Sequence, residues 1–145
     1  MITKEEKMEY PQYLEAVLGH FAPDAPKNIS CDEGWWILIA NCHKEITAID
    51  PDYTIFQIKE KFGGLRYYYS PSNPIHTPQI NEVVSKYEKI CSMTCEVTGR
   101  HGYLMRKGQR GLGLLKTLNE DFMNDGWERV ENNNAVVVDN NFQGK

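Results

Sequence analysis

Apolar residues recur at intervals of three and four positions in three parts of the chain, at residues 11–21, 35–49 and 77–91. This spacing places them on one face of a helix, so the pattern predicts three amphipathic helices. Proline marks their limits, because it fits the first turn of a helix but stops a helix that precedes it. Pro11 and Pro78 open the first and third helices, and Asp50-Pro51 ends the second.

The second predicted helix has the strongest start signal. Ser30 and Glu33 have the spacing of a capping box, and Asp32 is a competing N-cap residue. Cys42 lies on the apolar stripe of this helix and is expected to be a small core residue. Trp36 lies off the stripe, so it either packs on another element or belongs to a contact surface.

Residues 54–69 change to the alternating pattern and the strand-forming residue types of a β-hairpin. Gly63-Gly64 offers a two-residue turn, and a turn at these residues places Lys61 opposite Arg66. Alternation then predicts a core face and an outer face. The core face contains Phe56, Ile58, Glu60, Phe62, Leu65, Tyr67 and Tyr69, and the outer face contains Gln57, Lys59, Lys61, Arg66 and Tyr68.

The C-terminal third is punctuated by glycines and has no sustained periodicity. Residues 95–113 are expected to form a tight hairpin or knuckle, followed by a short helix at 117–124. Val136-Val137-Val138 is a candidate final strand. The whole pattern predicts one α+β domain spanning residues 1–145, with residues 1–10 frayed. Its small antiparallel sheet, built on the hairpin, should pack against about three helices.

The distribution of charge matters more than the total charge. The formal net charge is −4, which argues against a protein that coats nucleic acid along its length. Residues 100–116 nevertheless hold five basic and no acidic residues, whereas residues 1–50 hold nine acidic and four basic ones. A basic island in an acidic chain favours one anionic ligand over a long polyanion. A solvated loop rich in lysine and arginine is the structural alternative.

The outer face of the hairpin is the first candidate binding surface. Like charges opposite each other destabilise a sheet, so the predicted Lys61–Arg66 pair is easier to explain if an anion or an acidic partner contacts it. Tyr68 adds an aromatic surface beside these cations, a combination that recognises phosphates and nucleotides. A solvent-exposed face without a ligand is the alternative. With the basic island, the candidate ligand-binding residues are Lys59, Lys61, Arg66, Tyr68, Arg106, Lys107 and Arg110.

Glu60 is a carboxylate predicted on the core face, where it needs a partner or a raised pKa. A tyrosine hydroxyl or a basic residue of the glycine-rich segment is the expected partner, and a catalytic acid is the alternative. No nucleophile, metal site or second catalytic group accompanies Glu60, so an enzyme is the weaker hypothesis.

No motif indicates a cofactor, a metal ion or a targeting signal. The chain has no Walker loop and no dinucleotide-binding fingerprint, and its four histidines lack metal-ligand spacing. The N-terminus has no apolar signal core, and no apolar run approaches the ~18 residues of a membrane span. We therefore expect a cytoplasmic protein whose four cysteines are reduced.

The segment 57–68, with the sequence QIKEKFGGLRYY, resembles the hairpin of a small, poorly characterised protein family of phages and bacteria. Members of that family share a K-E-K-F-G-G-L-R-[FY]-Y hairpin and an upstream Gly-Trp pair that opens a helix, which Gly34-Trp35 matches. Downstream they carry C-x-x-C-G and T-L-C-x-x-H, the pattern of a zinc knuckle. The resemblance spans residues 34–122 and implies a phage-type protein, but no defined activity.

The chain departs from the family at this knuckle-like segment, residues 95–122. Cys95 matches the first zinc ligand and Gly99 matches the glycine, but Thr98, Asn119 and Phe122 stand at the other three ligand positions. A structural zinc site needs four ligands, so we expect no metal and an apolar filling by Phe122. The knuckle is then held together by packing or by a ligand.

Three binding functions are compatible with these features, and none requires a cofactor. The first is sequestration, without turnover, of a small phosphate-bearing ligand such as a cyclic nucleotide immune signal, by a homo-oligomer acting in phage counter-defence. The second is a protein–protein inhibitor or adaptor that acts on a host protein through exposed aromatic residues such as Trp36 and Trp127. The third is binding of single-stranded nucleic acid, with bases stacked on Tyr68.

Overall fold

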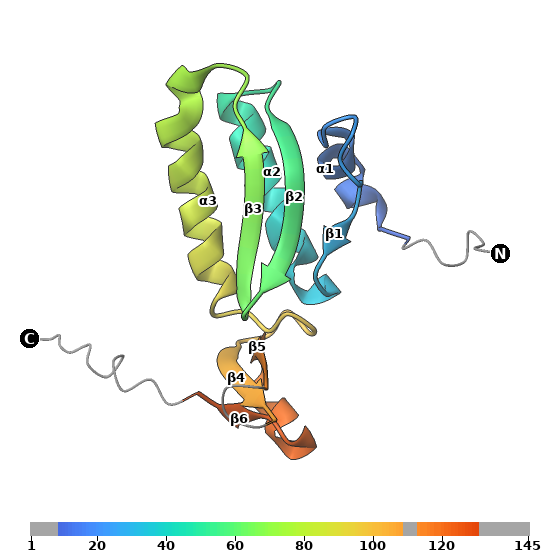
Figure 1. Ribbon diagram of the computed structural model, residues 1–145, viewed down its shortest axis with the longest axis vertical. Helices are drawn as coiled ribbons and strands as arrows, with labels where there is room; N and C mark the ends of the chain where they lie inside the picture. The colour runs from blue at the N-terminus through green and yellow to red at the C-terminus, as the bar shows by residue number, and fades with distance from the viewer. Residues whose placement is uncertain (1–8, 109–112, 131–145) are drawn as a thin grey trace, which may run out of the picture.

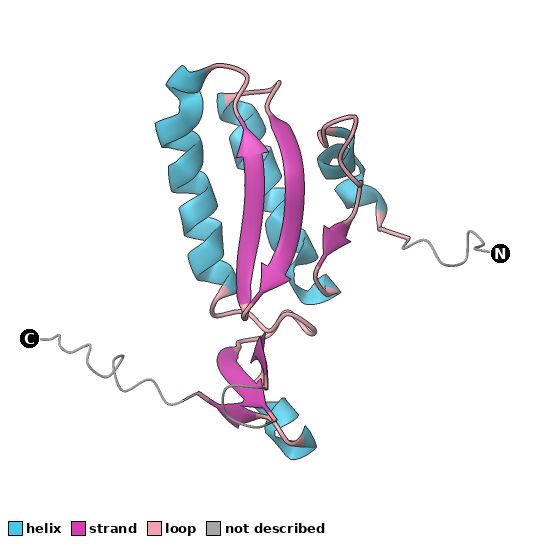
Figure 2. Ribbon diagram, viewed as in Figure 1, coloured by secondary structure: helices cyan, strands magenta, loops and turns pink. Residues whose placement is uncertain are grey.

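The computed structural model describes residues 9–108 and 113–130. These residues form an α+β structure with a larger part and a smaller part (Figure 1). In the larger part, β1 (Ile29–Ser30), β2 (Thr54–Lys61) and β3 (Gly64–Ser70) form one sheet in the order β1-β2-β3. Helices α2 (Trp36–Ile49) and α3 (Thr77–Cys91) lie side by side behind this sheet (Figure 2). The predicted α+β class is confirmed, although β1 pairs parallel with β2 and makes the sheet mixed.

All three predicted helical segments are present. The first is a 3₁₀ turn (Gln12–Leu14) that continues as α1 (Glu15–Gly19), and a second 3₁₀ turn (Glu33–Trp35) leads into α2. Asp50 is the C-cap residue of α2, as the following proline predicts. The predicted capping box is wrong, because Ser30 belongs to β1 and Asp32 caps the 3₁₀ turn without a side-chain hydrogen bond.

Trp36 is not an exposed contact residue. Its side chain is buried, with its indole Nε1 donating a hydrogen bond of 3.1 Å to the carbonyl oxygen of Cys31. Its ring packs against the ring of Tyr10, with 5.2 Å between the centroids. The prediction that Trp36 supplies a partner surface is therefore wrong, and its off-stripe position serves packing against the N-terminal segment.

The hairpin forms, but its turn lies one residue earlier than predicted. The turn is Phe62-Gly63, with φ of 55° and 82°, so Lys61 pairs with Gly64 and Lys59 pairs with Arg66. Moving a two-residue turn by one residue moves every pairing by two, so each side chain near the turn keeps its predicted face. The predicted Lys61–Arg66 pair is wrong, and Lys59 is the cation directly opposite Arg66.

A β-bulge changes the faces farther from the turn. The pairing of β2 with β3 shifts between Ile55 and Gln57, which leaves Phe56 as an extra residue. Ile55 and Ile58 are consequently both buried, whereas the side chain of Phe56 is 46% exposed. Phe62 is 65% exposed at the turn, so neither phenylalanine occupies the core face predicted for it.

The main core lies between the sheet and the two long helices, and a chain of three polar side chains crosses it. Nδ1 of His43 lies 2.6 Å from the Tyr53 hydroxyl oxygen, which lies 2.7 Å from the Tyr67 hydroxyl oxygen. All three side chains are buried. Burial, assisted by the neighbouring His20, lowers the pKa of His43 to about 4, so this imidazole is neutral at neutral pH.

The depressed pKa of His43 predicts acid sensitivity. Unfolding returns the pKa from about 4 to 6.5, so between these values the unfolded chain binds more protons than the folded chain. The free energy of unfolding should fall as pH is lowered through this window, by at most about 1.4 kcal/mol per pH unit from this group. Urea unfolding across the window measures the slope. His43→Gln should remove this contribution, and an unchanged slope in that variant contradicts the assignment.

The smaller part has its own sheet and core. β4 (Tyr103–Lys107) lies between β5 (Leu114–Leu118) and β6 (Glu128–Arg129), and both neighbours are antiparallel to it. The short helix predicted at 117–124 forms as a 3₁₀ helix (Glu120–Asp125), which begins later than expected because β5 extends to Leu118. Its core contains Cys95, Met105 and Leu118, with Tyr103, Phe122 and Trp127 packed against them. The predicted strand at 136–138 lies outside the described residues, as does most of the segment 1–10 that was expected to fray.

Contacts between the two parts bring together three segments: the Gly34-Trp35 pair, the hairpin turn and the knuckle-like segment at residues 95–122. The backbone N–H of Gly34 donates to the Glu96 carbonyl oxygen at 2.7 Å, and Nε1 of Trp35 donates to the Thr94 carbonyl oxygen at 2.8 Å. At the hairpin turn, the Thr117 hydroxyl donates to the Gly63 carbonyl oxygen at 2.7 Å. The Gly-Trp pair, the hairpin turn and the knuckle therefore share one junction.

An ionic cluster completes this junction. Nζ of Lys116 lies 3.2 Å from Oε1 of Glu96 and 3.5 Å from Oε1 of Glu60. Burial raises the pKa of Glu96, whereas the two carboxylates raise the pKa of Lys116 by more than burial lowers it. Oε2 of Glu60 also accepts the backbone N–H of Gly63 at 2.8 Å. The prediction of a basic partner for Glu60 is thus confirmed by Lys116, a residue of the basic island at 100–116.

Candidate functional site on the open face of the sheet

The face of β2 and β3 that points away from α2 and α3 is the open face (Figure 1). Among the described residues no helix packs on it, and both Gln57 and Tyr68 are exposed there. Gln57 is paired with Tyr68, and Lys59 is paired with Arg66. Because paired residues in an antiparallel sheet point to the same side, these four side chains form one continuous patch. The 45% exposed Tyr68 ring makes this patch aromatic as well as basic.

The cations of the open face have no acidic partner within the described part of the chain. None of the four ion pairs found there includes Lys59, Lys61 or Arg66. Glu60, the carboxylate between the two lysines, points to the junction and pairs with Lys116. Directly opposed like charges cost stability, so the Lys59–Arg66 pair favours an anion on this face.

Phe62 extends the open face at the hairpin turn. A bulky residue with φ of 55° is in the left-handed region, where asparagine or glycine is the usual occupant of such a turn. Its ring is nevertheless 65% exposed and lies 5.4 Å from Nζ of Lys61. An exposed aromatic ring on a strained backbone, next to a cation, is a contact feature that core packing does not explain.

The three candidates from the basic island do not form one site. Arg106 alternates with Lys107 along β4, so the two side chains point to opposite faces of the second sheet. Lys107 lies over the Trp127 ring, with its Nζ 5.7 Å from the ring centroid. Arg106 shares its face with Leu104, whose Cδ1 contacts the turn at Gly63. Arg106 therefore lies on the Leu104 face of β4, apart from Lys107, and Arg110 lies outside the described residues.

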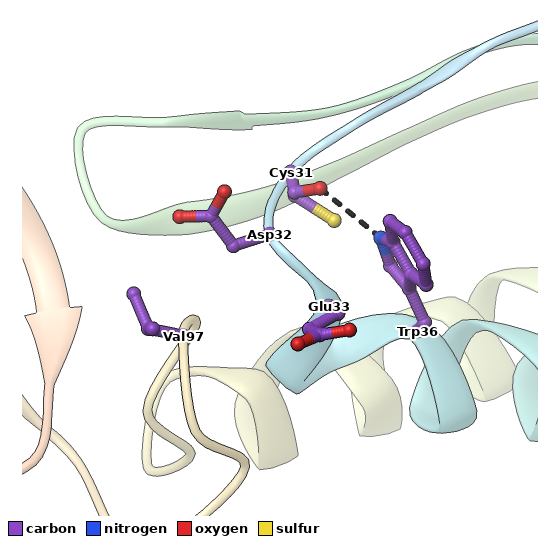
Figure 3. A pocket seen from close by; sticks show the side chains of 5 residues that line it. All are labelled: Cys31, Asp32, Glu33, Trp36 and Val97. Carbon is purple, nitrogen blue, oxygen red and sulfur yellow. Dashed lines mark hydrogen bonds between the residues drawn. The ribbon is translucent and has the colours of Figure 1, made fainter. Parts of the chain in front are cut away.

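A pocket of about 310 Å³ lies at the junction (Figure 3). Its charged lining residues are acidic, in contrast to the basic open face. Its lining includes Asp32, Glu33 and the buried thiol of Cys31. Burial, and then the nearby carboxylate of Glu96, raise the pKa of Cys31. The thiol therefore stays protonated, which argues against a nucleophilic role.

The zinc-knuckle positions come together in space, but their side chains do not fit a zinc ion. Sγ of Cys95 accepts the backbone N–H of Thr98 at 3.4 Å, and the backbone of Asn119 also donates to it. Burial raises the pKa of Cys95, but these hydrogen bonds outweigh it and the net shift is downward. Phe122 packs against the core that contains Cys95. One thiol beside hydroxyl, amide and phenyl groups is not a zinc donor set.

No protein-family model, curated protein or solved structure matches this chain. No helix in the described ranges is both long enough and apolar enough to cross a membrane.

Two exposed aromatic residues of the hairpin could not be placed from the sequence. Phe56 and Phe62 read as core residues by alternation, and only the bulge and the displaced turn expose them. The sequence signal for the exposed Phe62 is its place directly before Gly63-Gly64. A turn formed by Phe62 and Gly63 leaves the phenyl ring at the tip of the hairpin.

Proposed function

We propose that this chain is a binding protein without catalytic activity, and that its open face binds a short single-stranded nucleic acid. The observation that supports this most directly is the Lys59–Arg66 pair, which lies next to Tyr68 on a sheet face that no described helix covers. Neither cation has a carboxylate partner among the described residues.

The chemistry of the open face matches both components of a nucleotide chain. Lys59, Lys61 and Arg66 supply charge for phosphates, and the guanidinium group adds planar, two-pronged hydrogen bonding. Tyr68 and Phe62 offer exposed ring faces on which bases stack without sequence preference. Exposed aromatic residues on an open sheet are a recurring way to bind unpaired bases.

The position of these cations favours a strand of nucleic acid over a small sequestered ligand. Proteins that hold a small molecule bury most of its surface in a concave site. The pockets at the junction and between α1 and α2 are lined by other residues than these cations. The acidic character of the whole chain, which has a formal net charge of −4, favours binding of a short segment over a long polyanion.

Charge reversal on the open face is expected to abolish binding of a fluorescein-labelled single-stranded hexanucleotide. Lys59→Glu with Arg66→Glu replaces two phosphate contacts by repulsion, so the anisotropy titration should show a loss of roughly a hundredfold or more in affinity. Tyr68→Ala should cost about 1–3 kcal/mol through lost stacking. The affinity of the unaltered protein should fall steeply with added salt.

The matched control is the double variant Lys44→Glu with Lys89→Glu. It changes the net charge by the same amount but alters exposed lysines on α2 and α3, the helices behind the sheet. It should bind the hexanucleotide within roughly threefold of the unaltered protein. Equal losses in both double variants would refute a site on the open face. If a cyclic dinucleotide binds more tightly than the hexanucleotide, the proposed nucleic-acid binding is contradicted and ligand sequestration becomes the favoured function.

A further inference from the structure

A groove of about 390 Å³ runs between α1 and α2, on the helix layer and away from the open face. Its walls include Tyr13 and Ile37, which are 47% and 51% exposed, and His43 and Lys44 also line it. Large apolar side chains around a few polar groups are the usual composition of a small-molecule site.

The direction of the buried hydrogen-bond chain fixes what His43 offers to this groove. Within the described residues, the buried Tyr67 hydroxyl has no partner other than the Tyr53 oxygen. Its proton must therefore go to Tyr53, because a buried hydroxyl proton without an acceptor is costly. Tyr53 in turn donates to Nδ1 of His43. A neutral imidazole that accepts at Nδ1 carries its proton on Nε2.

The Nε2–H of His43 has no acceptor in the parts of the chain that are described. The neighbouring His20 ring meets the His43 ring edge-on at 4.5 Å, but its own nitrogens face two carbonyl oxygens. Nε2 of His20 lies 2.9 Å from the Pro51 oxygen, and Nδ1 lies 3.1 Å from the Ala16 oxygen. His20 thus leaves the His43 donor free, on a side chain that is only 5% exposed and lines the groove.

We propose that this groove binds a small monoanion, a carboxylate carried on a flat apolar body. The carboxylate accepts the Nε2–H of His43 and pairs with the ammonium group of Lys44 at the rim. The apolar body lies against Tyr13 and Ile37, which would otherwise expose their hydrocarbon surface to water. An acceptor with negative charge is the ligand group that satisfies both the free donor and the rim cation.

A matched pair of probes tests the ligand class. 1-Naphthoate and 1-naphthylmethylammonium have the same aromatic body and opposite charge, and both are titrated into the ¹⁵N-labelled full chain. Naphthoate should shift the amide signals of α1 and α2, whereas the ammonium probe should bind at least roughly tenfold more weakly. Long-range ¹H–¹⁵N spectra should show the Nε2–H tautomer of His43.

Two variants locate the site without disturbing the core. Lys44→Glu and Ile37→Glu alter exposed residues of the groove, and each should weaken the binding of naphthoate by roughly tenfold or more. Lys89→Glu, on α3, should leave it unchanged. The proposal is overturned if naphthoate does not bind, if the ammonium probe binds as tightly, if both groove variants bind normally, or if His43 carries its proton on Nδ1.

Discussion

Gly34→Ala is expected to destabilise the protein by about 3 kcal/mol or more, which is a large share of the stability of a domain this size. A Cβ at residue 34 would lie 2.4 Å from the carbonyl oxygens of both Cys95 and Glu96. These are backbone atoms, held in place because Gly34 itself donates to the Glu96 oxygen. The methyl group therefore forces the knuckle away from the start of α2.

Thermal and urea unfolding measure this effect, with Gly19→Ala as the matched control. Gly19 ends α1, and a Cβ there would have no atom within 4 Å. Gly19→Ala should be neutral or slightly stabilising, since alanine loses less backbone entropy on folding. If the free energy of unfolding of Gly34→Ala is within roughly 1 kcal/mol of that of the unaltered protein, the close contact between the start of α2 and the knuckle is wrong.

A zinc site is expected to appear when three side chains are exchanged for ligands. Thr98→Cys, Asn119→Cys and Phe122→His would surround Cys95, whose sulfur already accepts backbone N–H groups of residues 98 and 119. Gly99 has the positive φ of 82° that the turn after the second ligand requires. Zinc binding should raise the thermal midpoint of the triple variant by more than roughly 10 °C, because structural zinc contributes directly to folding.

Cobalt gives the sharper readout, because tetrahedral cobalt thiolates absorb visible light. The triple variant should bind one equivalent with these bands, and the same variant carrying Cys95→Ala should lose them. Without metal, the triple variant should be less stable than the unaltered protein. It loses the hydrogen bond that the Asn119 side-chain amide donates to the His101 carbonyl oxygen, and it loses the packing of Phe122. Absence of the cobalt bands would show that these four positions do not converge.

The helices could be predicted from the sequence because their signals are local and redundant. Residues 35–49 combine a regular apolar stripe with a proline stop, and α2 ends at Ile49 as expected. The hairpin turn could not be placed, because local preference selects Gly-Gly over a phenylalanine with positive φ. Its position depends on a distant contact, since a Cβ at Gly63 would lie 2.6 Å from Cδ1 of Leu104.

The candidate site was only partly predictable for the same reason. Lys59, Lys61, Arg66 and Tyr68 were placed on one face because a one-residue error in the turn preserves alternation. Arg106 and Lys107 cannot both share a face with them, since adjacent strand residues point to opposite faces. The structural role of Glu60 depends on Lys116, which lies far along the chain and on another sheet.

The most direct test of the open face as the binding surface is an amide chemical-shift map with the single-stranded hexanucleotide. The account predicts that the shifts cluster on β2 and β3, at Lys59, Arg66, Tyr68 and the Phe62 turn. Signals of α1 and α2, which line the separate groove, should stay in place. Shifts confined to the helix layer, or no shifts at a concentration that saturates a micromolar site, would contradict it.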